Sequence, residues 1–156
     1  MLELKQKEIE LLGHFRSNAR ATLTEMSKAT RIPVSTIFDK LRQYEDGLII
    51  KKHTTLLDFR KLGYDIKIQL LVMVDKGQRE GLQRFLAIHP KVNTVFRVNN
   101  GYDFLIEAIF RDMNELDEFT RKLDEHGIRE KKEFFVMEEI KREEFMAYKD
   151  NLGVQR

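Results

Sequence analysis

The chain has 156 residues, of which 42% are hydrophobic and 35% charged, and its formal net charge is +2 at pH 7. This length and apolar content suffice for one ordinary domain or two small ones with a buried core. No apolar run approaches the roughly 18 residues of a membrane span, and the N-terminus MLELKQKEIELL does not resemble a secretory signal. We therefore expect a cytoplasmic protein that makes no membrane contact. The absence of cysteine excludes disulfides, thiolate nucleophiles and cysteine-ligated metal sites.

Charge is distributed unevenly along the chain. Residues 1–53 carry 10 Lys and Arg against 7 Asp and Glu, whereas residues 64–140 carry 12 against 15. The net charges of +3 and −3 favour a polyanionic partner for the first segment only. A solvated surface alone often shows an excess of this size, so the charge does not decide the matter by itself.

The first fifty residues begin with two predicted helices. Apolar side chains at helical spacing indicate a helix over about residues 4–16 that ends near Ser17-Asn18. Thr22 and Glu25 have the spacing of a capping box, in which each side chain binds the other residue's backbone amide. We expect the second helix to begin there and to end near Thr30.

A third helix follows a short turn. Pro33 suits its first turn, and Gly47 ends it where a residue able to take positive φ is wanted. Helical spacing predicts a buried face made of Val34, Ile37, Phe38 and Leu41. The outward face is polar and consists of Ser35, Thr36, Asp39, Lys40, Arg42 and Gln43. Because a helix fits the major groove of B-DNA, this face is a candidate for DNA binding. The alternative is an ordinary solvated helix face.

The second half of the chain predicts the order strand, helix, strand, strand, helix, strand. The expected strands cover Asp65–Val74, Val92–Val98, Tyr102–Phe110 and about Ile128–Met137, and the helices cover residues 82–88 and about Met113–Leu123. Asn100-Gly101 is a hairpin signal, because both residues tolerate the positive φ of a type I′ turn. This order is that of a ferredoxin-like βαββαβ domain, so the whole chain is predicted to be α+β.

The predicted sheet has apolar side chains on both of its faces. With helices on one side, the other side carries Leu71, Met73, Val95, Leu105 and Ile109. An exposed apolar patch of this kind usually marks association, so we expect a sheet-to-sheet homodimer. The alternative is that the C-terminal segment around Phe145–Tyr148 covers part of the sheet.

Several segments of the chain resemble the Lrp/AsnC (feast/famine) transcription regulators. TLTEMSKATRIPVSTIFDKLRQYEDGLIIKKHTTLLDFRKLGYDI is similar to their helix-turn-helix and linker, and VNNGYDFLIEAIFRDMNEL and FFVMEEIK are similar to their effector-binding domain. The resemblance covers about residues 4–141. It implies a winged helix-turn-helix over residues 1–50, a linker strand over 51–63, a ferredoxin-like effector-binding and oligomerisation domain over 64–140, and a C-terminal tail over 141–156, which we expect to be a frayed helix.

The resemblance also implies a function and its partners. We expect a sequence-specific DNA-binding transcription regulator, not an enzyme, whose partner is double-stranded DNA and whose homodimers assemble into an octamer. Lys51 and Lys52 in the linker are candidate phosphate contacts, and a solvated charge pair is the alternative. No cofactor and no metal are expected, because the 4 histidines are scattered along the sequence.

The resemblance places an amino-acid effector near the hairpin at Asn100-Gly101, between the second and third predicted strands, and near the last strand. The matching residues are Asn99, Asn100, Gly101, Tyr102 and Asp103. Asp103 can accept a hydrogen bond from an ammonium group, or it can merely cap the turn. The glycine stands one place later than in the family pattern, and Lys131 and Glu133 occupy positions that are often Ser or Thr. The sequence therefore leaves the effector's identity open.

Two alternatives to the regulator are weighed, an enzyme and a sensor without DNA binding. Among enzymes, siroheme decarboxylases resemble the same two-domain family, but Arg97 alone represents their His- and Arg-rich signature. Acylphosphatase-like chemistry would combine Arg97 with Asn99 or Asn100, yet the sequence has no phosphate-cradling glycine loop. The second alternative is a small-molecule sensor or interaction protein without DNA binding, because Gln43 and Tyr44 stand where relatives often have Arg and Leu.

Overall fold

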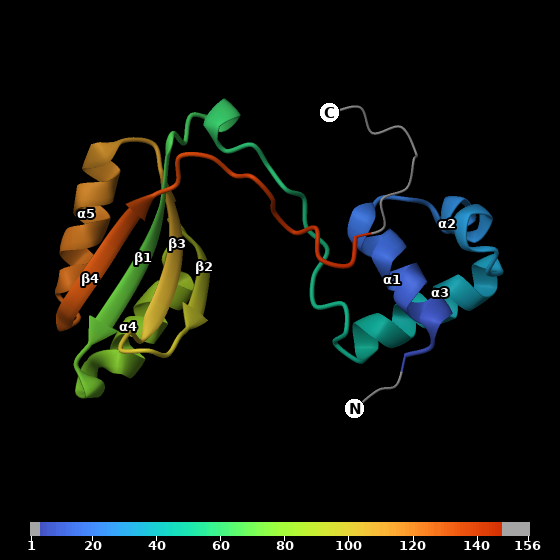
Figure 1. Ribbon diagram of the computed structural model, residues 1–156, viewed down its shortest axis with the longest axis horizontal. Helices are drawn as coiled ribbons and strands as arrows, with labels where there is room; N and C mark the ends of the chain where they lie inside the picture. The colour runs from blue at the N-terminus through green and yellow to red at the C-terminus, as the bar shows by residue number, and fades with distance from the viewer. Residues whose placement is uncertain (1–3, 148–156) are drawn as a thin grey trace. The chain divides into compact units, whose positions relative to one another are not determined.

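The structure is a computed structural model that describes residues 4–147. The chain divides into two compact units (Figure 1). The first contains the described residues up to Leu56 together with the segment from Ile140 onward, and the second spans Leu57–Glu139. None of the helices in the described part combines the length and apolarity that a bilayer crossing requires.

Three helices build the first unit. They are α1 (Gln6–Ser17), α2 (Leu23–Thr30) and α3 (Val34–Asp46). The predicted capping box is confirmed: Glu25 N–H donates to the Thr22 hydroxyl at 3.2 Å, and Thr22 N–H donates to the Glu25 carboxylate at 2.7 Å. The turn between α2 and α3 passes through Arg31, whose φ of +57° lies in the left-handed region.

The core of the first unit draws on all three helices. Its buried members are Leu11, Phe15, Met26, Ile37 and Tyr44. The predicted inward position of Ile37 is confirmed, and Leu41 packs against the cluster, but the prediction for Val34 and Phe38 is wrong. These two side chains are 42% and 54% exposed. The buried stripe of α3 runs through Ile37 and Tyr44, and Phe38 lies about 100° around the helix from Ile37.

Gly47 ends α3 for a different reason from the one that the sequence suggested. Its φ is −80°, whereas the following residue, Leu48, takes the left-handed value of +55°. A Cβ atom at Gly47 would lie 3.0 Å from the backbone oxygen of Gln43. The glycine therefore permits a close approach of backbone to backbone.

The predicted linker strand is absent from the structure. Residues 51–58 have no regular secondary structure, and a 3₁₀ turn over Arg60–Leu62 follows. A strand requires a neighbouring strand to satisfy its backbone groups, and the sheet of the described chain contains only β1, β2, β3 and β4.

A four-stranded antiparallel sheet with two helices builds the second unit. The elements are β1 (Ile66–Val74), a 3₁₀ turn (Lys76–Gln78), α4 (Arg79–Ile88), β2 (Val92–Arg97), β3 (Phe104–Phe110), α5 (Met113–Asp124) and β4 (Ile128–Phe135). The strand order is β2-β3-β1-β4. The predicted α+β class, with a helix-turn-helix followed by a ferredoxin-like sheet, is confirmed.

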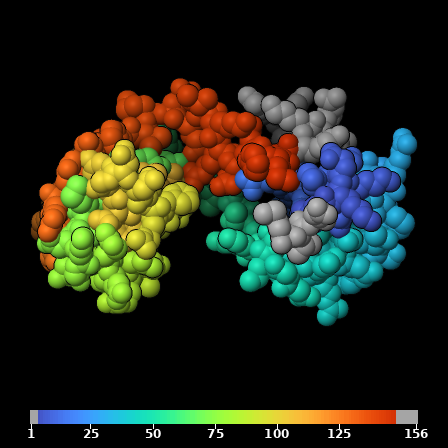
Figure 2. Space-filling model, turned by 60° about the horizontal axis from the view of Figure 1, so that its bottom comes forward, coloured from blue at the N-terminus to red at the C-terminus, as the bar shows by residue number. Residues whose placement is uncertain are grey.

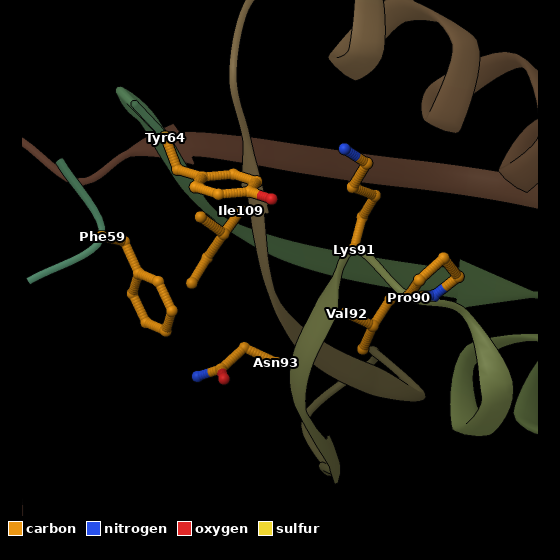
Figure 3. A pocket seen from close by; sticks show the side chains of 7 residues that line it. All are labelled: Phe59, Tyr64, Pro90, Lys91, Val92, Asn93 and Ile109. Atoms are coloured by element: carbon orange, nitrogen blue, oxygen red, sulfur yellow. The ribbon is translucent and has the colours of Figure 1, made fainter. Parts of the chain in front are cut away.

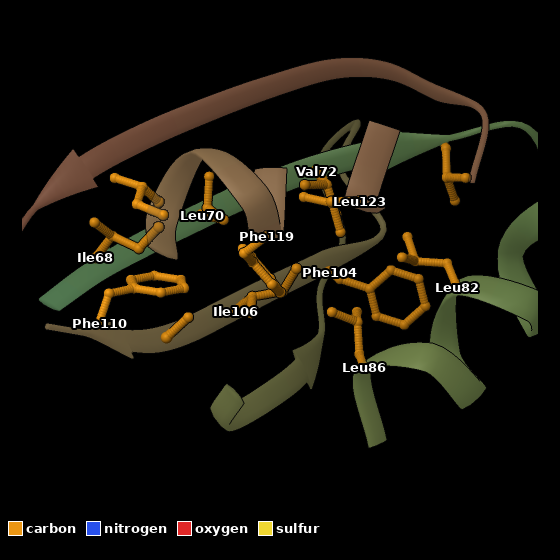
Figure 4. Close-up of a cluster of buried hydrophobic side chains, with 13 residues drawn as sticks. Ile68, Leu70, Val72, Leu82, Leu86, Phe104, Ile106, Phe110, Phe119 and Leu123 are labelled. Carbon is orange, nitrogen blue, oxygen red and sulfur yellow. The ribbon is translucent and has the colours of Figure 1, made fainter. Parts of the chain in front are cut away.

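Helices α4 and α5 cover one face of this sheet (Figure 4). Alternate residues of β1 from Ile68 to Val74 are buried there, as the sequence alternation predicts. They pack against Leu82 and Leu86 of α4 and against Phe119 of α5. This core positions the β2–β3 hairpin at one end of the sheet.

The opposite face, which we call the open face, differs from the prediction on β2. A register shift between Val92 and Thr94 leaves Val95 opposite Ile106 and Phe96 opposite Leu105. Val95 therefore packs against the buried core, and Phe96, 57% exposed, takes its place on the open face. The prediction for Val95 was wrong because sequence alternation does not reveal a bulge, which exchanges the faces of all following residues.

The C-terminal segment forms no helix within residues 136–147, so the expectation of a frayed helix is wrong there. It belongs to the first unit from Ile140 onward, and the Glu143 carboxylate accepts a hydrogen bond from Arg16 at 2.7 Å. Phe145 is 79% exposed, and the alternative that this segment covers part of the sheet stays a prediction. Tyr148 lies outside the described residues.

Candidate functional site

The predicted DNA-binding face of α3 is largely present in the structure. The exposed members of the predicted set on this helix are Ser35, Thr36, Asp39, Arg42 and Gln43. They lie on the part of α3 that faces away from the buried stripe of Ile37 and Tyr44. The regular helix therefore presents hydroxyl, carboxylate, guanidinium and amide groups together on one surface.

Lys40 does not share this outward face. Its ammonium donates to Glu8 Oε1 at 2.6 Å and to Gln43 Oε1 at 3.3 Å. The Tyr44 hydroxyl also donates to Glu8 Oε1, at 3.4 Å. Because Lys40 lies three residues after Ile37 and four before Tyr44, it points to the same side as the core. Its charge serves the contact between α1 and α3.

These contacts shift two pKa values in opposite directions. The hydrogen bond from Lys40, assisted by the Lys5 backbone amide, lowers the pKa of Glu8 below its ordinary value. Burial, with the neighbouring Glu8 carboxylate, raises the pKa of Tyr44 to about 12. Tyr44 is therefore a neutral core residue, and its departure from the family pattern does not alter the outward face.

The two linker lysines, Lys51 and Lys52, are exposed and lie in an irregular segment of the first unit. A further basic side chain that the prediction omitted is Arg31, exposed in the turn that leads into α3. The sequence predicts the turn itself. It does not predict the left-handed backbone at Arg31, because arginine has no preference for that conformation.

The predicted effector residues form the β2–β3 hairpin, which lies at the surface (Figure 2, yellow). Asn100 and Gly101 both have positive φ, +62° and +91°, so the predicted turn is confirmed. Asn99, Asn100 and Gly101 are exposed. Tyr102 is half-buried, and its hydroxyl donates to Glu130 of β4 at 2.5 Å.

Asp103 differs from the other hairpin residues because it is buried. Its carboxylate accepts a hydrogen bond from Val74 N–H at 2.9 Å and forms an ion pair with Arg79. Burial alone would raise the pKa of Asp103, but these two contacts outweigh it, and the pKa is lowered. Asp103 thus fixes the hairpin to the end of β1 and the start of α4. Both partners of its carboxylate lie outside the Asn100-Gly101 turn, and its role toward an effector stays a prediction.

A small pocket lies at the other end of β3, and sequence reasoning missed it. Its volume is about 120 Å³. Figure 3 shows the rings of Phe59 and Tyr64 beside Ile109, with Asn93 on the β2 side. Lys91 also lines it, but the ammonium is paired with Glu115 at 2.5 Å. Nothing in the sequence signals this pocket, because its aromatic walls come from the irregular segment before β1.

No group of three or more potential metal ligands occurs among the residues from 4 to 147.

Comparison with known proteins agrees with this arrangement. The model of the Lrp/AsnC ligand binding domain matches residues 68–145. The HTH-type transcriptional regulator FL11 of Pyrococcus horikoshii is 30% identical over 117 residues, which cover 75% of this chain and 76% of the relative. The glutamate uptake regulatory protein of Zymomonas mobilis is 27% identical over 89% of this chain and 87% of its own.

A solved structure extends the likeness to nearly the whole chain. A transcriptional regulator from Neisseria meningitidis, in complex with L-Met, superimposes with a TM-score of 0.83 at 27% identity. The alignment covers 90% of this chain and 94% of the other. The family model, the relatives and the fold agree, and the chain belongs to the Lrp/AsnC family of transcription regulators.

Proposed function

We propose that the first unit binds duplex DNA in a sequence-specific manner through α3, and that the second unit senses an amino acid. The chain then regulates transcription in the cytoplasm and has no catalytic role. The observation that carries the proposal is the polar outward face of α3, which is exposed while the opposite side of the same helix is buried.

The outward face suits base recognition. A helix of the helix-turn-helix type contacts base edges with side chains from its N-terminal part. Ser35 and Thr36 occupy the first turn of α3, where short hydroxyl side chains allow a close approach. Asp39 can accept a hydrogen bond from cytosine N4, and Arg42 can bind guanine or a phosphate. Lys51, Lys52 and Arg31 supply further positive charge for phosphates.

The open face supports the proposal of a homodimer. Helices cover only one side of the sheet, and the open face carries Leu71, Met73, Phe96, Leu105 and Phe134. Phe96 and Phe134 are 57% and 51% exposed. A second copy packed on this face would remove these rings from water. Two helix-turn-helix units would then serve two half-sites about 34 Å apart on DNA. Assembly of such dimers into an octamer is proposed from family resemblance.

The hairpin supports the proposal of an amino-acid effector. The relative from Neisseria meningitidis was solved with L-Met, and the one from Zymomonas mobilis is named for glutamate uptake. In this chain Asn99 and Asn100 carry exposed amides at the turn, and the backbone N–H groups around Gly101 can donate to a carboxylate. Asp103 contributes by holding this turn in place.

A mobility-shift assay tests the central proposal. Full-length protein is titrated into a duplex carrying the promoter region of its own gene at two salt concentrations. We expect a shift at low salt that weakens at high salt, because phosphate contacts release counterions. Absence of any shift at low salt would exclude DNA binding and favour a sensor that acts through other partners.

Effector binding has a separate test. Because a ligand that binds only the folded state raises its melting temperature, the twenty amino acids are screened by thermal shift. Asn100→Ala should reduce the shift that the best ligand gives, and Asn93→Ala, outside the hairpin, should leave it unchanged. If no amino acid raises the melting temperature, the effector proposal fails while DNA binding stands.

A further inference from the structure

Two apolar side chains on α3 remain outside the core of the first unit. Val34 and Phe38 are 42% and 54% exposed, and neither is a buried member of the cluster of that unit. They are four residues apart, so they lie one above the other on the helix surface. The apolar strip that they form occupies the N-terminal half of α3, which is the half that a helix-turn-helix inserts toward bases.

The residues beside Phe38 on the helix surface are polar. Ser35 lies three residues before it and Arg42 four residues after it, so both border the ring on the same surface. Both neighbours are exposed. An aromatic residue with an arginine one turn away on the same helix surface, in a segment of net charge +3 over residues 1–53, suits a polyanion that also offers apolar contacts.

Duplex DNA has one such feature in its major groove. The C5 methyl group of thymine is apolar, and it is the group that side chains such as phenylalanine contact there. We propose that Phe38 recognises thymine by packing its ring against this methyl group, with Val34 flanking the contact. This inference rests on the proposed function, because it requires that α3 enters the major groove.

Replacing thymine by uracil in the DNA tests the proposed methyl contact at one base position at a time. A duplex is first enriched from a random-sequence library with the full-length protein. Each thymine is then replaced in turn by deoxyuridine, which lacks only the methyl group. At the contacted position we expect the wild-type affinity to fall roughly fourfold, the effect of exposing one methyl group.

Variants of Phe38 are then compared on the thymine and the uracil duplexes. Phe38→Ala should weaken binding to the thymine duplex and abolish the difference between thymine and uracil at that position. Phe38→Leu should retain part of the difference, because its side chain is still apolar. The dependence of affinity on salt should be unchanged in both, since no phosphate contact is removed. Ile88→Ala, which truncates an 84% exposed apolar side chain in the second unit, serves as the control.

Three outcomes would overturn the inference. The first is a wild-type affinity that no uracil substitution changes. The second is a uracil effect that persists in Phe38→Ala, which would assign the methyl contact to another residue. The third is a change of oligomeric state in Phe38→Ala by analytical ultracentrifugation, which would assign the strip to a second copy of the chain. If the library yields no enriched duplex, the proposed function itself fails.

Discussion

Lys40 of α3 donates a hydrogen bond to Glu8 of α1, with 2.6 Å between Nζ and Oε1. The Glu8 side chain is only 18% exposed, and the hydrogen bond from Lys40 stabilises its negative charge. Lys40→Met should lower the melting temperature by roughly a few degrees, as followed by circular dichroism. Arg42→Met, on the outward face of the same helix, should leave the melting temperature unchanged. Equal melting temperatures for both variants would show that Lys40 does not stabilise the helix pair.

The same ion pair predicts a dependence of stability on pH. The pKa of Glu8 is lowered in the folded protein from an ordinary value of 4.5. A carboxylate of this kind stabilises the folded state above its unfolded pKa, and the stabilisation is lost as the pH falls through the folded pKa. The protection of α1 and α3 amides from hydrogen exchange, relative to the intrinsic exchange rate at each pH, should therefore fall below about pH 4.5. In Glu8→Gln this loss of protection should be smaller; an unchanged pH profile of protection would contradict the assignment.

The buried contacts of Asp103 are expected to stabilise the second unit. Asp103→Asn removes the negative charge that pairs with Arg79 and leaves an uncharged amide beside the guanidinium. We expect a loss of about 1–3 kcal/mol in the free energy of unfolding, measured by urea titration. Asp124→Asn is the control, because Asp124 pairs with Lys131 at the surface and such pairs contribute about 0–1 kcal/mol. Similar losses in both variants would mean that burial of Asp103 is unimportant.

The left-handed backbone at Arg31 predicts that replacement of this residue by glycine does not lower stability. Its φ of +57° costs a residue with a Cβ about 1–2 kcal/mol. Arg31→Gly should therefore retain or raise stability, even though glycine makes the unfolded chain more flexible. Lys28→Gly, inside α2, should lose about 1 kcal/mol. Thermal unfolding of both variants provides the comparison, and a large loss in Arg31→Gly would show that the arginine side chain itself is needed there.

The open face predicts an effect on oligomeric state. Leu105→Lys places a charge at the centre of this face, opposite Phe96 on β2 and Leu71 on β1. We expect monomers in sedimentation velocity, since burying an unpaired ammonium is costly. Ile88→Lys, on the exposed side of α4, should leave the dimer intact. A dimer that survives Leu105→Lys would place the interface elsewhere.

Local chemistry made part of the structure predictable from the sequence. The capping box of Thr22 and Glu25 and the turn at Asn100-Gly101 each depend on residues within a few positions, so the pattern determines the geometry. The alternation along β1 also predicted its buried face, because that strand keeps its register with β3.

The remaining features depend on contacts between distant residues. Lys40 turned inward because Glu8, on another helix, offers a carboxylate. Phe38 is exposed because the buried stripe of α3 passes through Ile37 and Tyr44, and helical periodicity alone does not say which side of a helix the neighbouring helices cover. The position of Phe96 depends on a bulge in the pairing of β2 with β3. Asp103 was recognised as part of the hairpin, but its burial depends on Val74 and Arg79.

The central claim is that the outward face of α3 distinguishes DNA sequences. The most direct test is the ratio of the affinities of the wild-type protein for an enriched duplex and for a shuffled duplex of the same composition, measured by fluorescence anisotropy at physiological salt. We expect the enriched duplex to bind about a thousandfold more tightly or better. Equal affinities for the two duplexes would contradict sequence-specific recognition by this helix.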